Sequence, residues 1–186
     1  YRYLLEYARA WAIGLTKASD FDQMQVWFTF LKATFEDTIM HNRTFWAQEL
    51  RLSVDDLDQT VMAETKRSYT SHELARAFEG DRATTLMALM PCTVLYRQLG
   101  EDLLPLCRLP EDNRYHQWLA YYTRPAYIAK CQQQIELINC WCAGKSQDEL
   151  KALLEVFAIS CNYELLQWRD MYDKMQTWPL ETLFPQ

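Results

Sequence analysis

A cysteine and a tyrosine stand at helical spacing beside a proline near the middle of the chain. Cys92 and Tyr96 are four residues apart and share one helix face, and Pro91 locally disturbs that helix because it lacks a backbone donor. A thiol that attacks a substrate needs partial exposure and a nearby hydrogen-bond donor or cation that lowers its pKa. A buried cysteine that acts as a small apolar residue fits the same pattern, and spacing alone favours this second interpretation.

Glu164 is the other candidate for chemistry. It falls in the most apolar of the predicted helices, with Cys161 and Trp168 on nearby faces. Burial at such a position would raise the pKa of the carboxyl group by desolvation, which is a property wanted in a general acid. A glutamate on the solvent-facing side of the helix fits the pattern equally well.

Three further polar groups are weaker candidates. Capping of a helix start explains the hydroxyl-rich run at residues 68–73. Asp37 and His41 are four residues apart, which allows a carboxylate–imidazole pair. Cys140 and Cys142 flank one tryptophan, but no histidine or second cysteine pair lies near them, and no histidine belongs to a Glu-x-x-His unit. We therefore expect no metal site.

The charge balance limits the classes of partner. The 186 residues carry 19 Lys and Arg against 25 Asp and Glu, a net charge of −6, which argues against a nucleic-acid or anionic-membrane surface. The longest uncharged apolar run, residues 86–96, contains a proline and is too short to span a bilayer. The chain opens inside an amphipathic pattern, so we expect no signal peptide. The six cysteines form no Cys-x-x-Cys motif, and we expect reduced thiols in a cytoplasmic protein.

The apolar spacing is helical almost throughout. Only 4 glycines and 6 prolines are present, too few turn residues for a many-stranded β fold. Helix-start signals occur at residues 19–20, 53–56, 81 and 146–149, and Gly80 is a helix-stop signal. A loop is expected from Gly100 to residue 113, and an irregular tail after Trp178. The expected helices cover residues 3–18, 21–46, a short turn near 54, 68–78, 81–99, 115–122, 125–142 and 147–172. The prediction is an all-α fold, a single-domain helical bundle over residues 1–186.

Aromatic residues are unusually frequent. They make up 14% of the chain and include 11 tyrosines, many at positions that a helix would turn inward. Buried tyrosine hydroxyls need hydrogen-bond partners. A tyrosine-rich interior therefore indicates either a polar network or a pocket for a flat ligand.

Six blocks of the sequence, taken in their order and spacing, resemble the TenA family (thiaminase II, aminopyrimidine aminohydrolase). They are YRYLLEYARAWAIGLTKA, the region ending at His41, RSYTSHELARAFEG, ALMPCTVLYRQLGEDLL, YHQWLAYYT and FAISCNYELLQWRDMYD, and they cover nearly the whole chain. The resemblance implies a haem-oxygenase-like fold and a homotetramer. It also implies hydrolysis of thiamin-derived aminopyrimidines, and of thiamin itself, to hydroxymethylpyrimidine for thiamin salvage, with neither a metal nor an organic cofactor.

The resemblance assigns roles to particular residues. Cys92 would be the nucleophile and Glu164 the acid/base, and Tyr96 would contact the pyrimidine and orient Cys92. Tyr3, Tyr69 and Tyr122 would line the pocket as stacking or hydrogen-bonding groups. The family also carries an aspartate just before the segment that matches residues 1–3, and the given sequence begins after that position.

Two other functions remain open from the sequence. One is a helical module that binds a thiamin-related pyrimidine, or another flat ligand, without turning it over. The other is a redox enzyme of the same fold with haem, a quinone or a di-metal centre, and the presence of only 3 histidines argues against it.

Overall fold

The computed structural model describes residues 1–173, and every regular element in that range is a helix, which confirms the predicted all-α class. Three short segments, η1, η2 and η3, have π-helical or 3₁₀ geometry. The elements are α1 (Arg2–Thr16), α2 (Phe21–Ala33), η1 (Thr34–Ile39), η2 (Asn42–Trp46), α3 (Ala47–Leu50), α4 (Val54–Gln59), α5 (Glu64–Glu79), α6 (Arg82–Leu103), η3 (Leu104–Leu106), α7 (Arg114–Tyr122), α8 (Pro125–Cys142) and α9 (Gln147–Tyr172).

The capping residues that the sequence indicates do begin the helices. Asp20 accepts a hydrogen bond from the backbone N–H of Gln23 at the start of α2, and Asp81 does the same for Thr84 at the start of α6. Ser53 and Ser146 form capping boxes at the starts of α4 and α9. Each such cap stabilises its helix by about 1 kcal/mol, because it satisfies backbone donors that have no partner within the helix.

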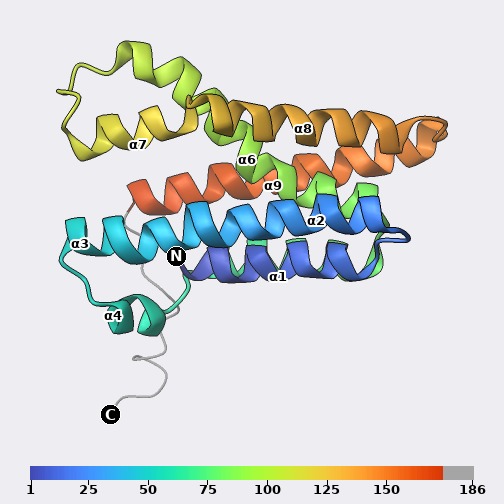
Figure 1. The fold of residues 1–186 in the computed structure, drawn as a ribbon, viewed down its shortest axis with the longest axis horizontal. Coiled ribbons are helices and arrows are strands. Elements are labelled where there is room, and N and C mark those ends of the chain that lie inside the picture. The colour runs from blue at the N-terminus through green and yellow to red at the C-terminus, as the bar shows by residue number, and fades with distance from the viewer. Residues whose placement is uncertain (174–186) are drawn as a thin grey trace.

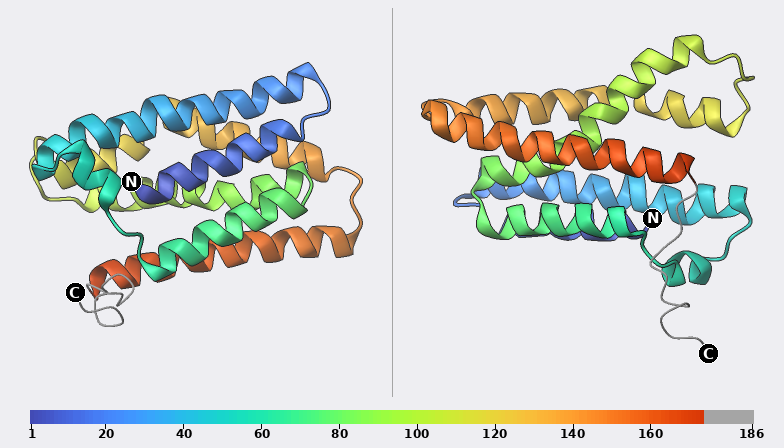
Figure 2. Two further views of the ribbon diagram at one scale, coloured as in Figure 1. Left: turned by 90° about the horizontal axis from the view of Figure 1, so that it is seen from below. Right: turned by 180° about the vertical axis from the view of Figure 1, so that it is seen from behind.

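The central element of the fold is α6. The long helices run along the long axis of the molecule, and α6 passes obliquely among them (Figures 1 and 2). It packs against α9, α8, α5 and α7, while α1 packs against α5 and α2. Because α6 has neighbours on several sides, nearly all of its residues from Ala83 to Pro91 are buried. The helix that carries Cys92 is thereby held firmly from several directions.

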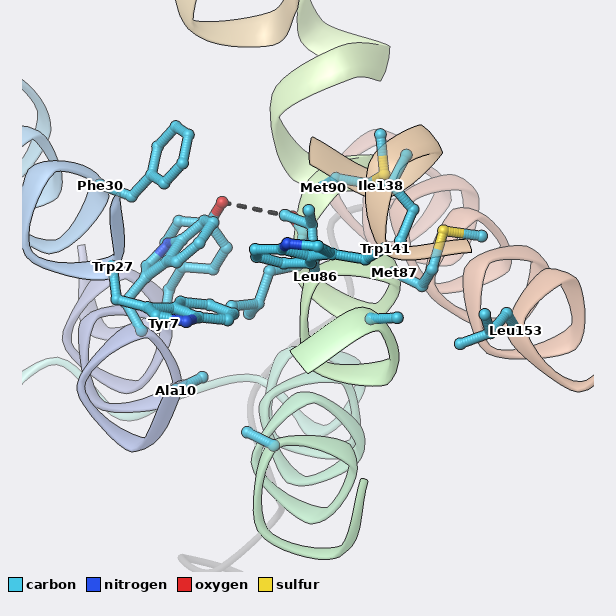
Figure 3. Packing of buried hydrophobic residues seen from close by; sticks show 14 of the residues in the cluster. Tyr7, Ala10, Trp27, Phe30, Leu86, Met87, Met90, Ile138, Trp141 and Leu153 are labelled. Atoms are coloured by element: carbon cyan, nitrogen blue, oxygen red, sulfur yellow. Dashed lines mark hydrogen bonds between the residues drawn. The ribbon is translucent and has the colours of Figure 1, made fainter. Parts of the chain in front are cut away.

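Aromatic side chains fill the core between α1, α2 and α8 (Figure 3). Trp11 stacks on Phe30 with ring centroids 4.9 Å apart, and Trp27 stacks on Trp141 at 5.7 Å. Gly14 allows this packing, because a Cβ atom there would lie 2.4 Å from the Trp27 ring. The close approach of α1 and α2 therefore depends on a residue without a side chain.

Two predicted boundaries are wrong. Gly100 was expected to open a loop, but α6 continues through it to Leu103. A Cβ atom at Gly100 would lie 3.0 Å from Tyr122 Cβ, so the glycine provides room for α7 rather than ending a helix. The second error concerns α5, which begins at Glu64 instead of residue 68. The polar run at residues 68–73 is therefore helix interior, and capping does not explain it.

The predicted helix over residues 21–46 is confirmed as a continuous helical rod, but its second half contains the π-helical segments η1 and η2. The predicted irregular tail after Trp178 lies outside the residues that the structure describes. Within residues 1–173, none of the helices is long and apolar enough to cross a membrane.

Candidate functional site

Buried polar side chains meet where α1, α5, α6 and α9 come together. We call this set the polar cluster, and it consists of Tyr3 from α1, Lys66, Tyr69 and Glu73 from α5, Cys92 and Tyr96 from α6, and Tyr163, Glu164 and Gln167 from α9. Four helices that are distant in sequence contribute to it, so the cluster exists only in the folded chain.

Helical periodicity turns these side chains to the same place. Lys66, Tyr69 and Glu73 are three and four residues apart and share one face of α5. Cys92 and Tyr96 share a face of α6 in the same way. The sequence pattern therefore fixes which side chains of each helix point inward, and the packing of the helices brings the faces together.

Cys92 and Glu164 are neighbours in the cluster. Glu164 is only 3% exposed, and Cys92 is half-buried against the core. Burial is the largest cause that raises the pKa of the Cys92 thiol well above its usual range, and the charges of Glu164 and Glu73 add to it. Tyr3 and Lys66 oppose this, yet burial outweighs them, so the expected lowering of the thiol pKa is not found. The resting side chain is a neutral thiol.

Glu164 has the properties of a general acid. Burial raises the pKa of its carboxyl group, while the charge of Lys66 and hydrogen bonding with Tyr69 and Cys92 act in the opposite direction. The side-chain amide of Gln167 donates hydrogen bonds to Glu164 Oε2 and, at 3.1 Å, to the Tyr96 hydroxyl. Glu164 Oε1 has no partner of good geometry among the described residues. One carboxyl oxygen is thus held in place and the other is left to exchange a proton.

Aromatic rings surround the thiol and the carboxyl group. Tyr3 and Tyr69 have ring centroids 5.3 Å apart, and Tyr69 stacks on Tyr163 at 5.4 Å. On the other side, Tyr96 contacts Tyr122 of α7 at 5.1 Å. The structure therefore brings together all six residues for which the sequence suggested a role, with Tyr122 entering through its contact with Tyr96.

We did not predict from the sequence that Glu73, Lys66 and Gln167 belong to the polar cluster. Glu73 is fully buried, and its Oε1 lies 2.7 Å from the Tyr3 hydroxyl oxygen. Lys66 Nζ lies 4.5 Å from the centroid of the Tyr3 ring. One signal was available, because Glu73 follows Tyr69 by four residues and must share its helix face. Because residues 68–73 were interpreted as the capped start of a helix, the shared face of Tyr69 and Glu73 was not recognised.

The Asp37–His41 pair suggested by the sequence is not supported by the geometry. The His41 ring stacks between Phe45, at 5.0 Å and 8°, and Tyr121, at 5.7 Å and 11°, and does not pair with Asp37 among the described residues. Burial lowers the pKa of His41. Across residues 1–173, no group of three or more His, Cys, Asp or Glu side chains is arranged to hold a metal ion.

Comparison with known proteins gives consistent matches over most of the chain. The chain is 27% identical over 173 residues to an aminopyrimidine aminohydrolase from Helicobacter pylori, which covers 92% of this chain and 79% of that protein. It is 28% identical over 172 residues to an aminopyrimidine aminohydrolase from Bacillus subtilis, covering 92% and 72% of the two chains.

The fold has also been seen before. The TenA homologue from P. horikoshii OT3 superposes with a TM-score of 0.79 at 22% identity, over 90% of this chain and 76% of that one. Its likeness supports the expected haem-oxygenase-like architecture. The model of the TENA/THI-4/PQQC family matches residues 1–174. The chain belongs to the TENA/THI-4/PQQC family.

Proposed function

We propose that this protein hydrolyses thiamin-derived aminopyrimidines to the corresponding hydroxymethylpyrimidine, as part of thiamin salvage, and that thiamin itself is a further substrate. The observation that carries the proposal is the adjacent pair of Cys92 and Glu164 within a ring of tyrosines. Two relatives that bear the name aminopyrimidine aminohydrolase support it.

A planar heterocycle suits the side chains of the polar cluster. Tyrosine rings stack on flat faces with centroids about 4.5–7 Å apart, and their hydroxyls bond to ring nitrogens and amino groups. Tyr3 and Tyr69 form one pair of contacting rings, and Tyr96 and Tyr122 form another. We assign these four residues to substrate binding. They hold the ring so that its electron-poor carbon faces the sulfur, which lowers the entropic part of the barrier.

The chemistry requires one nucleophile and one proton donor. The Cys92 sulfur adds to a ring carbon and its proton passes to Glu164, while Glu164 gives its own proton to a ring nitrogen, so that no charge builds up on the ring. The amine then takes a proton from Glu164 and leaves the exocyclic methylene group as ammonia; from thiamin, the thiazolium leaves as the neutral thiazole. Water adds at the methylene carbon and gives a proton to the carboxylate of Glu164 or, with thiamin, to solvent, after which the ring nitrogen returns its proton to the sulfur as the thiol leaves the ring. The sum is amine plus water giving alcohol plus ammonia.

Both groups begin the reaction neutral. The raised pKa of Glu164 keeps a proton available for donation, and the raised pKa of Cys92 means that the thiolate must form at the moment of attack. The thiol proton and the Glu164 proton are therefore exchanged within one buried group of side chains.

The neutral thiol also favours a second candidate, a module that binds the pyrimidine without turnover. An assay with an aminomethylpyrimidine separates the two, with ammonia and hydroxymethylpyrimidine measured in equal amounts. Sustained release of both supports the hydrolase. Tight binding in calorimetry with no product over hours would overturn it and support the binding module.

We further propose a cytoplasmic location and a homotetrameric assembly. All six cysteines are free thiols in the structure, which suits a reducing compartment. An exposed apolar face on α2 supports the assembly and is treated in the Discussion.

A further inference from the structure

Glu73 is a buried carboxyl group that the proposed reaction does not use. It has no exposed surface, and its Oε2 atom has no hydrogen-bond partner among the described residues. It forms no ion pair in residues 1–173, although Lys66 lies on the same helix face. A fully buried carboxylate without an ion pair and with one unbonded oxygen is strongly disfavoured. The geometry therefore indicates the neutral acid.

A neutral carboxylic acid carries one O–H donor, and a buried donor needs an acceptor. The structure supplies one partner for it, the Tyr3 hydroxyl oxygen, which lies 2.7 Å from Glu73 Oε1. Next to an ionised Glu73 the Tyr3 O–H is the donor of this bond, and next to the neutral acid the donor and the acceptor exchange roles. When the Glu73 O–H donates to this oxygen, the Tyr3 O–H must point elsewhere. The Cys92 thiol of α6 is a close neighbour of Tyr3, and each of the two groups shifts the pKa of the other.

We propose that Glu73 is a positioning residue that acts through Tyr3, a neutral acid whose O–H turns the Tyr3 hydroxyl proton toward the Cys92 sulfur and so stabilises the thiolate when it forms. A hydrogen bond to a charged group is stronger than one to a neutral group. The hydrogen bond from Tyr3 therefore stabilises Cys92 mainly during the attack, when the sulfur becomes negative.

The pKa directions agree with this arrangement. Burial raises the pKa of Glu73 well above its usual range, and the negative charge of Glu164 adds to this rise. Hydrogen bonding with Tyr3 lowers the pKa of Cys92. The groups that face Glu73 are Tyr3 and Tyr7 of α1, Lys66 and Tyr69 of α5, Cys92 of α6 and Glu164 of α9. Hydrogen bonding with Tyr3 and the charge of Lys66 lower the pKa of Glu73, but burial is the largest cause and outweighs them.

The test measures the rate at which iodoacetamide alkylates Cys92 in the full chain, by peptide mass spectrometry, with the exposed Cys140 as an internal reference. Glu73→Gln places an amide N–H where the acid O–H stood, so the rate at neutral pH should stay within about threefold of wild type. Glu73→Met has a similar size but no donor, and should slow alkylation by about tenfold. Tyr3→Phe should slow alkylation of Cys92 to the same degree. The double variant Tyr3→Phe/Glu73→Met should be alkylated at the same rate as Tyr3→Phe alone.

Two results would overturn the proposal. One is a Glu73→Gln rate as low as that of Glu73→Met, which would mean that the carboxylate charge is what matters. The other is a Glu73→Met rate equal to wild type. If Glu73→Met does not fold, the pH dependence decides. Ionised Glu73 should draw the Tyr3 proton away from the sulfur, so wild-type alkylation should fall progressively behind that of Glu73→Gln as the pH rises, and parallel curves would contradict the proposal.

This inference rests on the role proposed for Cys92, but the alkylation assay contains no pyrimidine. If substitution of Glu73 does not change the rate of Cys92 alkylation, the inference is wrong and the hydrolase proposal is unaffected. If the substitution does change that rate but the protein does not turn over the pyrimidine, the hydrolase proposal is wrong and the role of Glu73 is retained.

Discussion

Gln167 contacts the carboxyl group that we propose as the proton donor. Its amide donates to Glu164 Oε2, while Oε1 has no hydrogen-bond partner among the described residues. A donor of this kind stabilises the carboxylate, so its removal should raise the pKa of Glu164 further.

Gln167→Met should therefore move the alkaline limb of the profile of kcat/KM against pH upward and lower kcat by about tenfold, with a smaller change in KM, because Glu164 must be protonated to act. Gln134→Met is the matched control, because Gln134 is as buried as Gln167 but its amide donates to Thr93 instead of Glu164. An unchanged profile in Gln167→Met would show that the amide does not control Glu164.

Glu73 gives a second prediction, for stability. Its pKa is raised in the folded state above the unfolded value of about 4.3, so its stabilising contribution is complete below that value and is lost as the pH rises through the folded pKa. Glu73→Gln does not titrate. Its free energy of unfolding should match wild type near pH 4 and exceed it increasingly toward about pH 9, by about 1.4 kcal/mol for each tenfold difference in proton affinity. Urea unfolding at several pH values measures this, and a difference that shrinks with rising pH would refute it.

The sequence could identify Cys92 and Glu164 as chemically interesting, but it could not decide their surroundings. Whether Glu164 is buried depends on how α9 lies against α5 and α6. Glu73 was overlooked for the same reason, since a polar residue in a polar helix gives no local sign of burial. Its contact with Tyr3 joins residues that are 70 positions apart.

At the scale of elements, helix starts were predictable because the caps are local. Asp20, Ser53, Asp81 and Ser146 each bond to a backbone N–H only three residues ahead. The failures involve tertiary contact. Gly100 resembles a helix-stop signal, but its lack of a side chain makes room for α7 against α6. A contact between two helices cannot be predicted from the residues next to Gly100 in sequence.

Gly14 tests the importance of such close contacts. In an ordinary helix interior, Gly→Ala increases stability by about 1 kcal/mol. In α1, the new methyl group would collide with the Trp27 ring, so Gly14→Ala should instead lower the free energy of unfolding by about 1–3 kcal/mol. Denaturant unfolding measures the change, and its sign is the test, because stabilisation would show that α1 and α2 are not packed as described.

At the scale of the whole molecule, one face of α2 is apolar and exposed. Phe21, Met24 and Phe28 of α2 fall on one helical stripe and, together with Phe35 of the adjoining η1, are 48–70% exposed. Exposed patches of this kind usually mark interaction surfaces. We expect a second copy of the chain to cover it, in line with the proposed tetramer.

Phe28→Lys should therefore give a smaller assembly than wild type in size-exclusion chromatography with light scattering, because a buried lysine at a subunit contact is unfavourable. Thr29→Lys, at an exposed position of the same helix about a quarter turn away from the stripe, is the control and should leave the assembly intact. A wild-type protein that is monomeric, or a Phe28→Lys variant of unchanged size, would contradict this role for α2.

The central claim is that one thiol in this fold attacks the pyrimidine. The most direct measurement compares Cys92→Ser with Cys142→Ser for turnover of an aminomethylpyrimidine, because both cysteines are half-buried but Cys142 lies at the end of α8, outside the polar cluster. Cys92→Ser should lower kcat by about 100-fold or more with unchanged helical content, while Cys142→Ser stays within about twofold of wild type. Near-wild-type turnover in Cys92→Ser would show that the reaction does not pass through this sulfur.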